Sequence, residues 1–207
     1  MLEIRIHGRG GQGGVIALEI LATAYFKQGQ FVQVFPEFGA ERRGAPVAAF
    51  MRVDKKPVRL RCKIYKPDCI IVLDPVLLNS VDVTEGLKEG GLILINSEKS
   101  GKELNFNKGF SPAVPLQRNA AGYSRLPDKS GLPYYKVYTV DATGIAIKYG
   151  LGARTSPIVN TTVLGAFCKL PLGLDIKVLK KAIEKKITIK TKNNLLAADD
   201  AYNSVKP

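Results

Sequence analysis

The chain has few of the residues that build metal centres and disulfides. It contains three cysteines, Cys62, Cys69 and Cys168, and a single histidine, His7. Cys62 and Cys69 are seven positions apart, a spacing that matches neither zinc sites nor the tight cysteine clusters of iron–sulfur centres. We therefore expect no metal site and no disulfide, and we interpret the cysteines as small buried thiols.

Long apolar runs are also missing. No uninterrupted apolar stretch reaches the roughly 18 residues that a membrane-spanning helix needs. Near the N-terminus, Glu3, Arg5 and His7 stand where a signal peptide would be apolar. The sequence thus predicts a cytoplasmic protein that does not bind membranes. With 207 residues and 45% apolar content, it predicts one domain spanning residues 1–207.

Positive charge is abundant and clustered. The formal net charge is +13, and residues 41–66 hold nine basic side chains against two acidic ones. A second cluster, residues 177–192, holds seven lysines against Glu184 and is typical of the solvated face of a helix. Such fields attract nucleic acid, a phosphorylated cofactor or an acidic protein.

Segments typical of strands and helices alternate along the chain. This alternation predicts an α/β fold with one largely parallel, twisted sheet and helices on both faces, similar to a Rossmann fold. Residues 97–133 are rich in Gly, Pro, Asn, Ser and Lys, and we expect a polar insertion there. The expected strands are 2–7, 31–35, 47–53, 69–73, 92–95 and 135–140. The expected helices are 15–26, 84–88, 142–149, 156–170, 175–187 and 196–202.

A glycine-rich segment follows the first expected strand. Gly8, Gly10 and Gly13 fit a dinucleotide-binding pattern, in which glycines bring the backbone close to a phosphate at the start of a helix. One alternative is NAD binding, for which Glu37 would be the ribose ligand, although it lies late and in a loop. Another is that the glycines only allow close packing of helix on sheet. The candidate binding residues of this segment are Gly8, Arg9, Gly10, Gly11, Gln12 and Gly13.

Two adjacent arginines, Arg42 and Arg43, occupy the loop after the second expected strand. Planar guanidinium groups flanked by glycines suit a phosphate or carboxylate clamp. The carboxyl ends of strands in an α/β sheet meet at one edge, so we expect this loop to lie beside the glycine segment. His7, which precedes the glycines, could donate to a ligand, but a structural role is favoured.

These motifs together resemble one family. The segments 7–13 and 35–47, with further stretches at 67–74, 140–143 and 160–167, are similar to the gamma subunit of pyruvate and related 2-oxoacid:ferredoxin oxidoreductases. The resemblance spans residues 1 to about 205 and weakens in the insertion. It is closer to the pyruvate and ketoisovalerate type than to the 2-oxoglutarate type.

The resemblance implies a role inside a complex. Enzymes of this family oxidatively decarboxylate a 2-oxoacid on thiamine diphosphate, pass electrons through iron–sulfur clusters to ferredoxin and release acyl-coenzyme A. This chain has no cysteine quartet, and Asn193-Asn194 lacks the preceding Gly-Asp-Gly of a thiamine diphosphate motif. The resemblance implies that alpha, beta and delta partners carry these cofactors. It also implies that this chain has no catalytic residue, supports assembly and helps to hold coenzyme A. The alternatives are a free-standing NAD-binding oxidoreductase and a nucleic-acid-binding protein. Against the second, the basic clusters contain no known nucleic-acid-binding motif.

Overall fold

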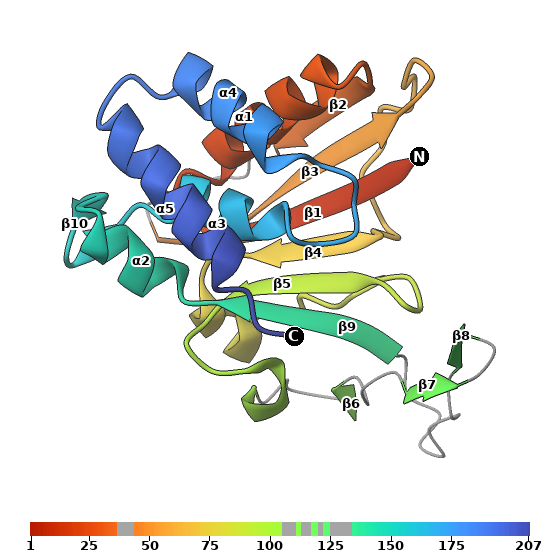
Figure 1. Ribbon diagram of the computed structural model, residues 1–207. Coiled ribbons are helices and arrows are strands. Elements are labelled where there is room, and N and C mark those ends of the chain that lie inside the picture. The colour runs from red at the N-terminus through yellow and green to blue at the C-terminus, as the bar shows by residue number, and fades with distance from the viewer. Residues whose placement is uncertain (37–43, 105–110, 113–116, 120–121, 125–133) are drawn as a thin grey trace.

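A seven-stranded sheet organises the computed structural model of the chain (Figure 1). The structure describes residues 1–36, 44–104, 111–112, 117–119, 122–124 and 134–207. The strand order is β2-β3-β1-β4-β5-β9-β6. The strands are β1 Leu2–Arg9, β2 Phe31–Pro36, β3 Pro46–Asp54, β4 Cys69–Val72, β5 Leu92–Asn96, β6 Ser111–Pro112 and β9 Tyr134–Val140. Two small ribbons pair β7 (Gln117–Asn119) with β8 (Gly122–Ser124) and β10 (Gly152–Ala153) with β11 (Ser156–Pro157).

The sheet is largely parallel, as expected, but one strand runs the other way. Strands β1, β4, β5, β9 and β6 pair in parallel, whereas β3 is antiparallel to both β1 and β2. A Rossmann arrangement would place β2 beside β1; here β3 lies between them. The short connection from β2 to β3 explains this, because a short loop can join antiparallel neighbours while a parallel crossover needs a dozen or more residues.

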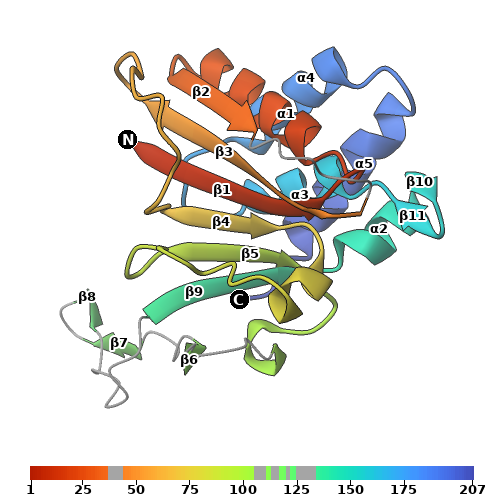
Figure 2. The same ribbon diagram turned by 180° about the vertical axis from the view of Figure 1, so that it is seen from behind.

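The α-helices gather on one face of the sheet (Figures 1 and 2). Helix α1 buries one side against β1, β2 and β3 and contacts α3 and α4, while its apolar residues Ile16 and Phe26 are 44% and 67% exposed. The closest helix contact joins α3 to α5, where a Cβ added at Gly165 would lie 2.0 Å from the Ala198 carbonyl oxygen. The helices are α1 Gly14–Lys27, α2 Ala142–Lys148, α3 Asn160–Phe167, α4 Ile176–Lys186 and α5 Thr191–Asn203.

The opposite face differs from the expected second helical layer. The 3₁₀ helix η1 (Pro75–Asn79) and turns that follow it cover β4, β5 and β9 there, with Leu77, Leu78 and Leu87 in a second apolar core. The helix expected over 84–88 is wrong: residues 84–86 form a turn, residues 87–88 are irregular, and Gly86 has a φ of +71° that interrupts helical geometry. The helix expected from Ser156 begins at Asn160, after β11.

Within residues 97–133, where the sequence predicts an insertion, the described residues form η2 (Gly101–Glu103), β6, β7 and β8. Strand β6 extends the sheet by pairing with the start of β9. In the parts of the chain that the structure describes, no helix combines the length and the apolar character needed to cross a membrane.

Two arginines are buried on the face away from the α-helices. Arg52, counted above in the basic cluster, is only 1% exposed, and its Nε lies 3.0 Å from Glu3 Oε1. Arg5, 6% exposed, donates to the carbonyl oxygens of Val83 and Glu85. The expectation that Arg52 belongs to an exposed positive field is therefore wrong. A buried charge is stable only when it is paired, and both guanidinium groups have partners.

Candidate functional site

The candidate site lies where β1 ends and α1 begins. Gly11 and Gly13 have φ values of +96° and +76°, a left-handed conformation that other residues rarely adopt. A Cβ at Gly13 would also lie 2.7 Å from Asn160 Nδ2. Backbone conformation therefore favours glycine at position 13, and a side chain there would also displace the Asn160 amide. The amides of this turn open a 14-residue helix whose first turn has no acidic residue, which favours an anion nearby.

A small polar network holds the turn in shape. The backbone N–H of Arg9 donates to Gln12 Oε1 at 2.8 Å, and Gln12 Nε2 donates to Asp74 Oδ2 at 3.0 Å. Arg9 Nε lies 3.1 Å from the same carboxylate oxygen. Asp74 follows β4 and also caps η1 by accepting from the Val76 N–H. The charge of Arg9 is thus balanced by Asp74.

The arginine loop joins this turn through the end that the structure describes. Gly10 N donates to the Ala45 carbonyl at 3.0 Å, and Gly44 N donates to the Gly10 carbonyl at 3.1 Å. Arg42 and Arg43 lie outside the described residues. The residues directly after them are therefore hydrogen-bonded to the glycine turn, in agreement with the expected neighbourhood of the two motifs.

A crevice of about 510 Å³ opens beside the turn along the carboxyl edge of the parallel strands. This is the edge at which open α/β sheets bind ligands. Of the described residues that line it, Arg9 and Asp74 are charged and pair with each other. The other described lining residues are neutral: Gly10, Gly11, Gln12, Gly44, Leu73, Pro75, Asn96, Thr143, Thr155, Ser156, Pro157 and Val159.

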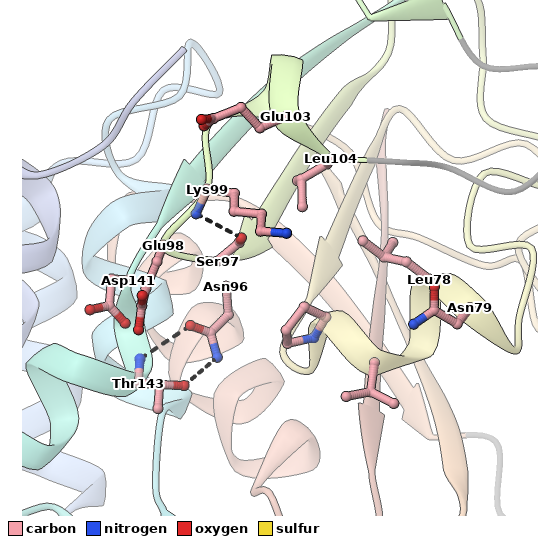
Figure 3. A pocket seen from close by; sticks show the side chains of 12 residues that line it. Leu78, Asn79, Asn96, Ser97, Glu98, Lys99, Glu103, Leu104, Asp141 and Thr143 are labelled. Atoms are coloured by element: carbon pink, nitrogen blue, oxygen red, sulfur yellow. Dashed lines mark hydrogen bonds between the residues drawn. The ribbon is translucent and has the colours of Figure 1, made fainter.

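Asn96 connects the ends of three neighbouring strands. Its Nδ2 donates to the Leu73 carbonyl at 2.9 Å. The same Nδ2 donates to Thr143 Oγ1 at 2.9 Å, and its Oδ1 accepts from the Thr143 N–H at 3.1 Å (Figure 3). Asp141 caps α2 by accepting from the Gly144 N–H. The strand ends of β4, β5 and β9 are thereby fixed around the crevice.

A second pocket of about 560 Å³ adjoins the crevice, since both are lined by Pro75, Asn96 and Thr143. It extends toward Lys99, whose N–H donates to Ser97 Oγ at 3.1 Å (Figure 3). The two hollows together form a polar trough along the carboxyl edge. Its lining combines neutral amide and hydroxyl groups in the crevice with the charged side chains of Glu98, Lys99, Glu103 and Asp141 in the second pocket, and it has room for an elongated polar molecule.

Comparison with known proteins decides the family. Residues 3–204 match the family model described as pyruvate ferredoxin/flavodoxin oxidoreductase. The chain belongs to this family. The resemblance noted from the sequence is therefore confirmed.

The relatives within this family are gamma or PorC subunits. The chain is 45% identical over 204 residues to the pyruvate/ketoisovalerate oxidoreductases common subunit gamma of Thermococcus kodakarensis, covering 98% of this chain and 96% of the relative. It is 46% identical over 208 residues to the pyruvate synthase subunit PorC of Methanocaldococcus jannaschii, covering 99% and 97%. The crystal structure of pyruvate oxidoreductase subunit PORC from Thermotoga maritima aligns with a TM-score of 0.76 at 32% identity, covering 99% and 97%.

His7 does not line the trough of this oxidoreductase family member. It is 8% exposed and belongs to the face of β1 that also bears Arg5, and its buried Nε2 has no hydrogen-bond partner among the described residues. Burial, and next the neighbouring Arg5, lowers its pKa from 6.5 to about 3. His7 is therefore neutral at physiological pH.

The cysteines are free thiols, and two of them are inaccessible. Burial raises the pKa of Cys69 and raises that of Cys168 to about 12, whereas Cys62 is exposed, contrary to the expectation of buried thiols. Among the residues that the structure describes, no three His, Cys, Asp or Glu side chains gather closely enough to hold a metal ion.

Three site residues were missed from the sequence: Asp74, Asn96 and Thr143. Asp74 and Thr143 entered the sequence analysis within the family-like stretches 67–74 and 140–143, without a role of their own. A signal was present, because each follows an expected buried strand at, or just past, its carboxyl end, where polar side chains converge on the ligand edge.

Proposed function

We propose that this chain is the gamma subunit of a pyruvate (2-oxoacid):ferredoxin oxidoreductase that converts pyruvate to acetyl-coenzyme A and reduces ferredoxin. Membership of the family and the gamma and PorC names of its relatives support this assignment. The chain assembles with alpha, beta and delta subunits, and thiamine diphosphate and the iron–sulfur clusters reside in those partners. Its own contribution is to assembly and binding, since the redox cofactors reside in the partner chains.

We further propose that the glycine turn and its attached arginine loop help to hold coenzyme A. One observation carries this proposal: Gly10 exchanges hydrogen bonds with Gly44 and Ala45, directly after Arg42 and Arg43. The exposed turn, whose Gly11 and Gly13 turn the backbone tightly, offers amides to a pyrophosphate. Guanidinium groups on the adjoining loop would supply bidentate donors to the same phosphates. The polar trough then provides room for the rest of an elongated molecule.

The test replaces both loop arginines in the assembled enzyme. Arg42→Ala with Arg43→Ala should raise the KM for coenzyme A about tenfold or more, because charge-assisted hydrogen bonds contribute about 1.5–3 kcal/mol each, while the subunits still co-purify. Lys181→Ala with Lys185→Ala, which removes two exposed lysines of α4, is the control. If the loop variant fails to assemble while coenzyme A still binds, the loop is an interface device and the coenzyme A proposal is wrong.

A further inference from the structure

The coil between β3 and β4 carries concentrated positive charge. Residues 55–66 hold no acidic side chain and six basic ones, all exposed: Lys55, Lys56, Arg59, Arg61, Lys63 and Lys66. We call this segment the basic strap. It leaves the end of β3 and passes the amino-terminal ends of β1 and β4 on the side away from the α-helices (Figure 2).

The strap is fixed to the sheet from beneath. Buried Arg52 donates from Nη1 to the Cys62 carbonyl at 2.7 Å and from Nη2 to the Lys63 carbonyl at 3.3 Å. Ile64 is fully buried at 0% exposure. The strap backbone is thus held in place while its charged side chains face solvent. A surface organised in this way loses less conformational freedom on binding a partner.

The strap's charge is not neutralised by its surroundings. Five of its cations form no ion pair with any residue that the structure describes: Lys55, Lys56, Arg59, Arg61 and Lys66. The adjoining turn, residues 82–89, contributes three carboxylates against the strap's six cations. An excess of positive charge therefore remains available to an acidic surface.

The lysines of α4 provide a contrast. Lys180 pairs with Asp199, and Lys186 Nζ lies 3.0 Å from Glu19 Oε2. The other face of this amphipathic helix is buried against the core. The α4 cluster is therefore an ordinary solvated helix face, as expected from the sequence, and it supplies exposed lysines for a matched control.

Two apolar side chains stand exposed among the strap's cations: Leu60 is 49% exposed and Tyr65 is 70% exposed. Arginine and tyrosine are enriched at protein interfaces. A surface with many charges and little apolar area suits a transient complex, because permanent interfaces are larger and more hydrophobic. Charge of this kind mainly accelerates association with an oppositely charged protein.

The strap also lies far from the glycine turn. In the β1–β3 pair, Leu2 faces Val53 at the strap end and Arg9 faces Pro46 at the turn end. Seven residue steps along a strand span about 23 Å. Substitutions in the strap therefore leave the crevice intact.

We propose that the basic strap is an electrostatic docking surface for an acidic electron-carrier protein that collects electrons from the assembled enzyme. This inference rests on the proposed function, because only an assembled oxidoreductase has electrons to deliver. The partner would present a surface rich in carboxylates and would bind the strap transiently.

The experiment compares two acceptors in the purified complex. The strap variant is Arg59→Gln, Arg61→Gln and Lys66→Gln, and the matched control is Lys177→Gln, Lys181→Gln and Lys185→Gln on α4. Pyruvate oxidation is followed with an acidic ferredoxin and with the small acceptor methyl viologen. For the strap variant we expect the KM for ferredoxin to rise about tenfold at low salt and to approach the wild-type value at about 0.5 M salt, where charges are screened. Methyl viologen turnover should be unchanged, as should both activities of the control.

Each other result decides against the proposal. An equal KM for ferredoxin in wild type and strap variant overturns it, as does an equal rise in the α4 control. Loss of subunits and of methyl viologen turnover in the strap variant would make the strap an assembly interface instead. Retardation of duplex DNA by the wild-type chain, lost in the strap variant while the KM is unchanged, would make the partner a nucleic acid. Failure of the wild-type chain to co-purify with other subunits would instead contradict the proposed function itself.

Discussion

Arg9 and Asp74 form an ion pair across the carboxyl edge of the sheet, with Arg9 Nε 3.1 Å from Asp74 Oδ2. The two residues come from different strand ends, since Arg9 closes β1 and Asp74 follows β4. Gln12 donates to the same carboxylate oxygen at 3.0 Å. Asp74 therefore fixes the glycine turn against β4 and balances the charge of Arg9 within the crevice.

Removing this carboxylate should loosen the turn. Asp74→Asn should lower the free energy of unfolding by about 0.5–1 kcal/mol, because the pair is partly exposed and its Coulomb energy is screened. Asp74→Ala should lower it by about 1–2 kcal/mol, since it also removes the cap of η1 and the acceptor of Gln12. Urea denaturation of both variants, combined with Arg9→Met in a double-mutant cycle, measures the coupling. Strictly additive effects of Arg9→Met and Asp74→Asn would show that the pair contributes nothing.

Buried His7 should make stability depend on pH. Its pKa is about 3 in the folded chain and 6.5 in the unfolded chain, so below pH 6.5 the unfolded state binds a proton that the folded state excludes. The stability contribution is thus lost as pH falls from about 6.5 to about 3, at about 1.4 kcal/mol per pH unit. Between pH 7.5 and 4.5, wild type should lose about 2–3 kcal/mol more unfolding free energy than His7→Leu. Parallel pH profiles of the two proteins would contradict this assignment.

Gly165 should not tolerate a larger side chain. A Cβ there would lie 2.0 Å from the Ala198 carbonyl oxygen, so Gly165→Ala must push α3 away from α5, and we expect a loss of about 1–3 kcal/mol in unfolding free energy. Gly14→Ala is the matched control, because its Cβ would meet only Leu73 Cδ1 at an ordinary 3.6 Å. Thermal denaturation should separate the two. A Gly165→Ala melting temperature at or above that of Gly14→Ala would refute the close packing.

Much of the local structure followed from the sequence because it depends on neighbouring residues. The apolar run at 69–73 predicted β4, which ends at Val72, and the nearly continuous apolar segment at 15–26 predicted helix α1. The position of the glycine turn was predicted as well, because a cluster of glycines indicates left-handed backbone conformations, which Gly11 and Gly13 adopt. The turn at 82–89 could not, since a segment that short has no helical periodicity to decide between turn and helix.

The site was predicted only in part, because some of its residues are defined by local motifs and others by long-range contacts. The glycine turn was located by its motif, while Asp74, Asn96 and Thr143 act through contacts between segments that are distant in the chain. Asn96 bonds to Thr143, 47 positions later, and this contact exists only because β5 lies beside β9. Whether Arg42 and Arg43 bind coenzyme A stays a prediction.

The sequence by itself determined the family, the order of most strands and helices, and the glycine turn, because motifs and periodicity are properties of adjacent residues. Tertiary structure alone decided that β3 separates β1 from β2, and that Arg52 is buried while the strap beside it stays exposed. Strand order and burial depend on which distant segments meet. The sequence alone does not distinguish an arginine that pairs with Glu3 in the interior, as Arg52 does, from one that faces water in the strap.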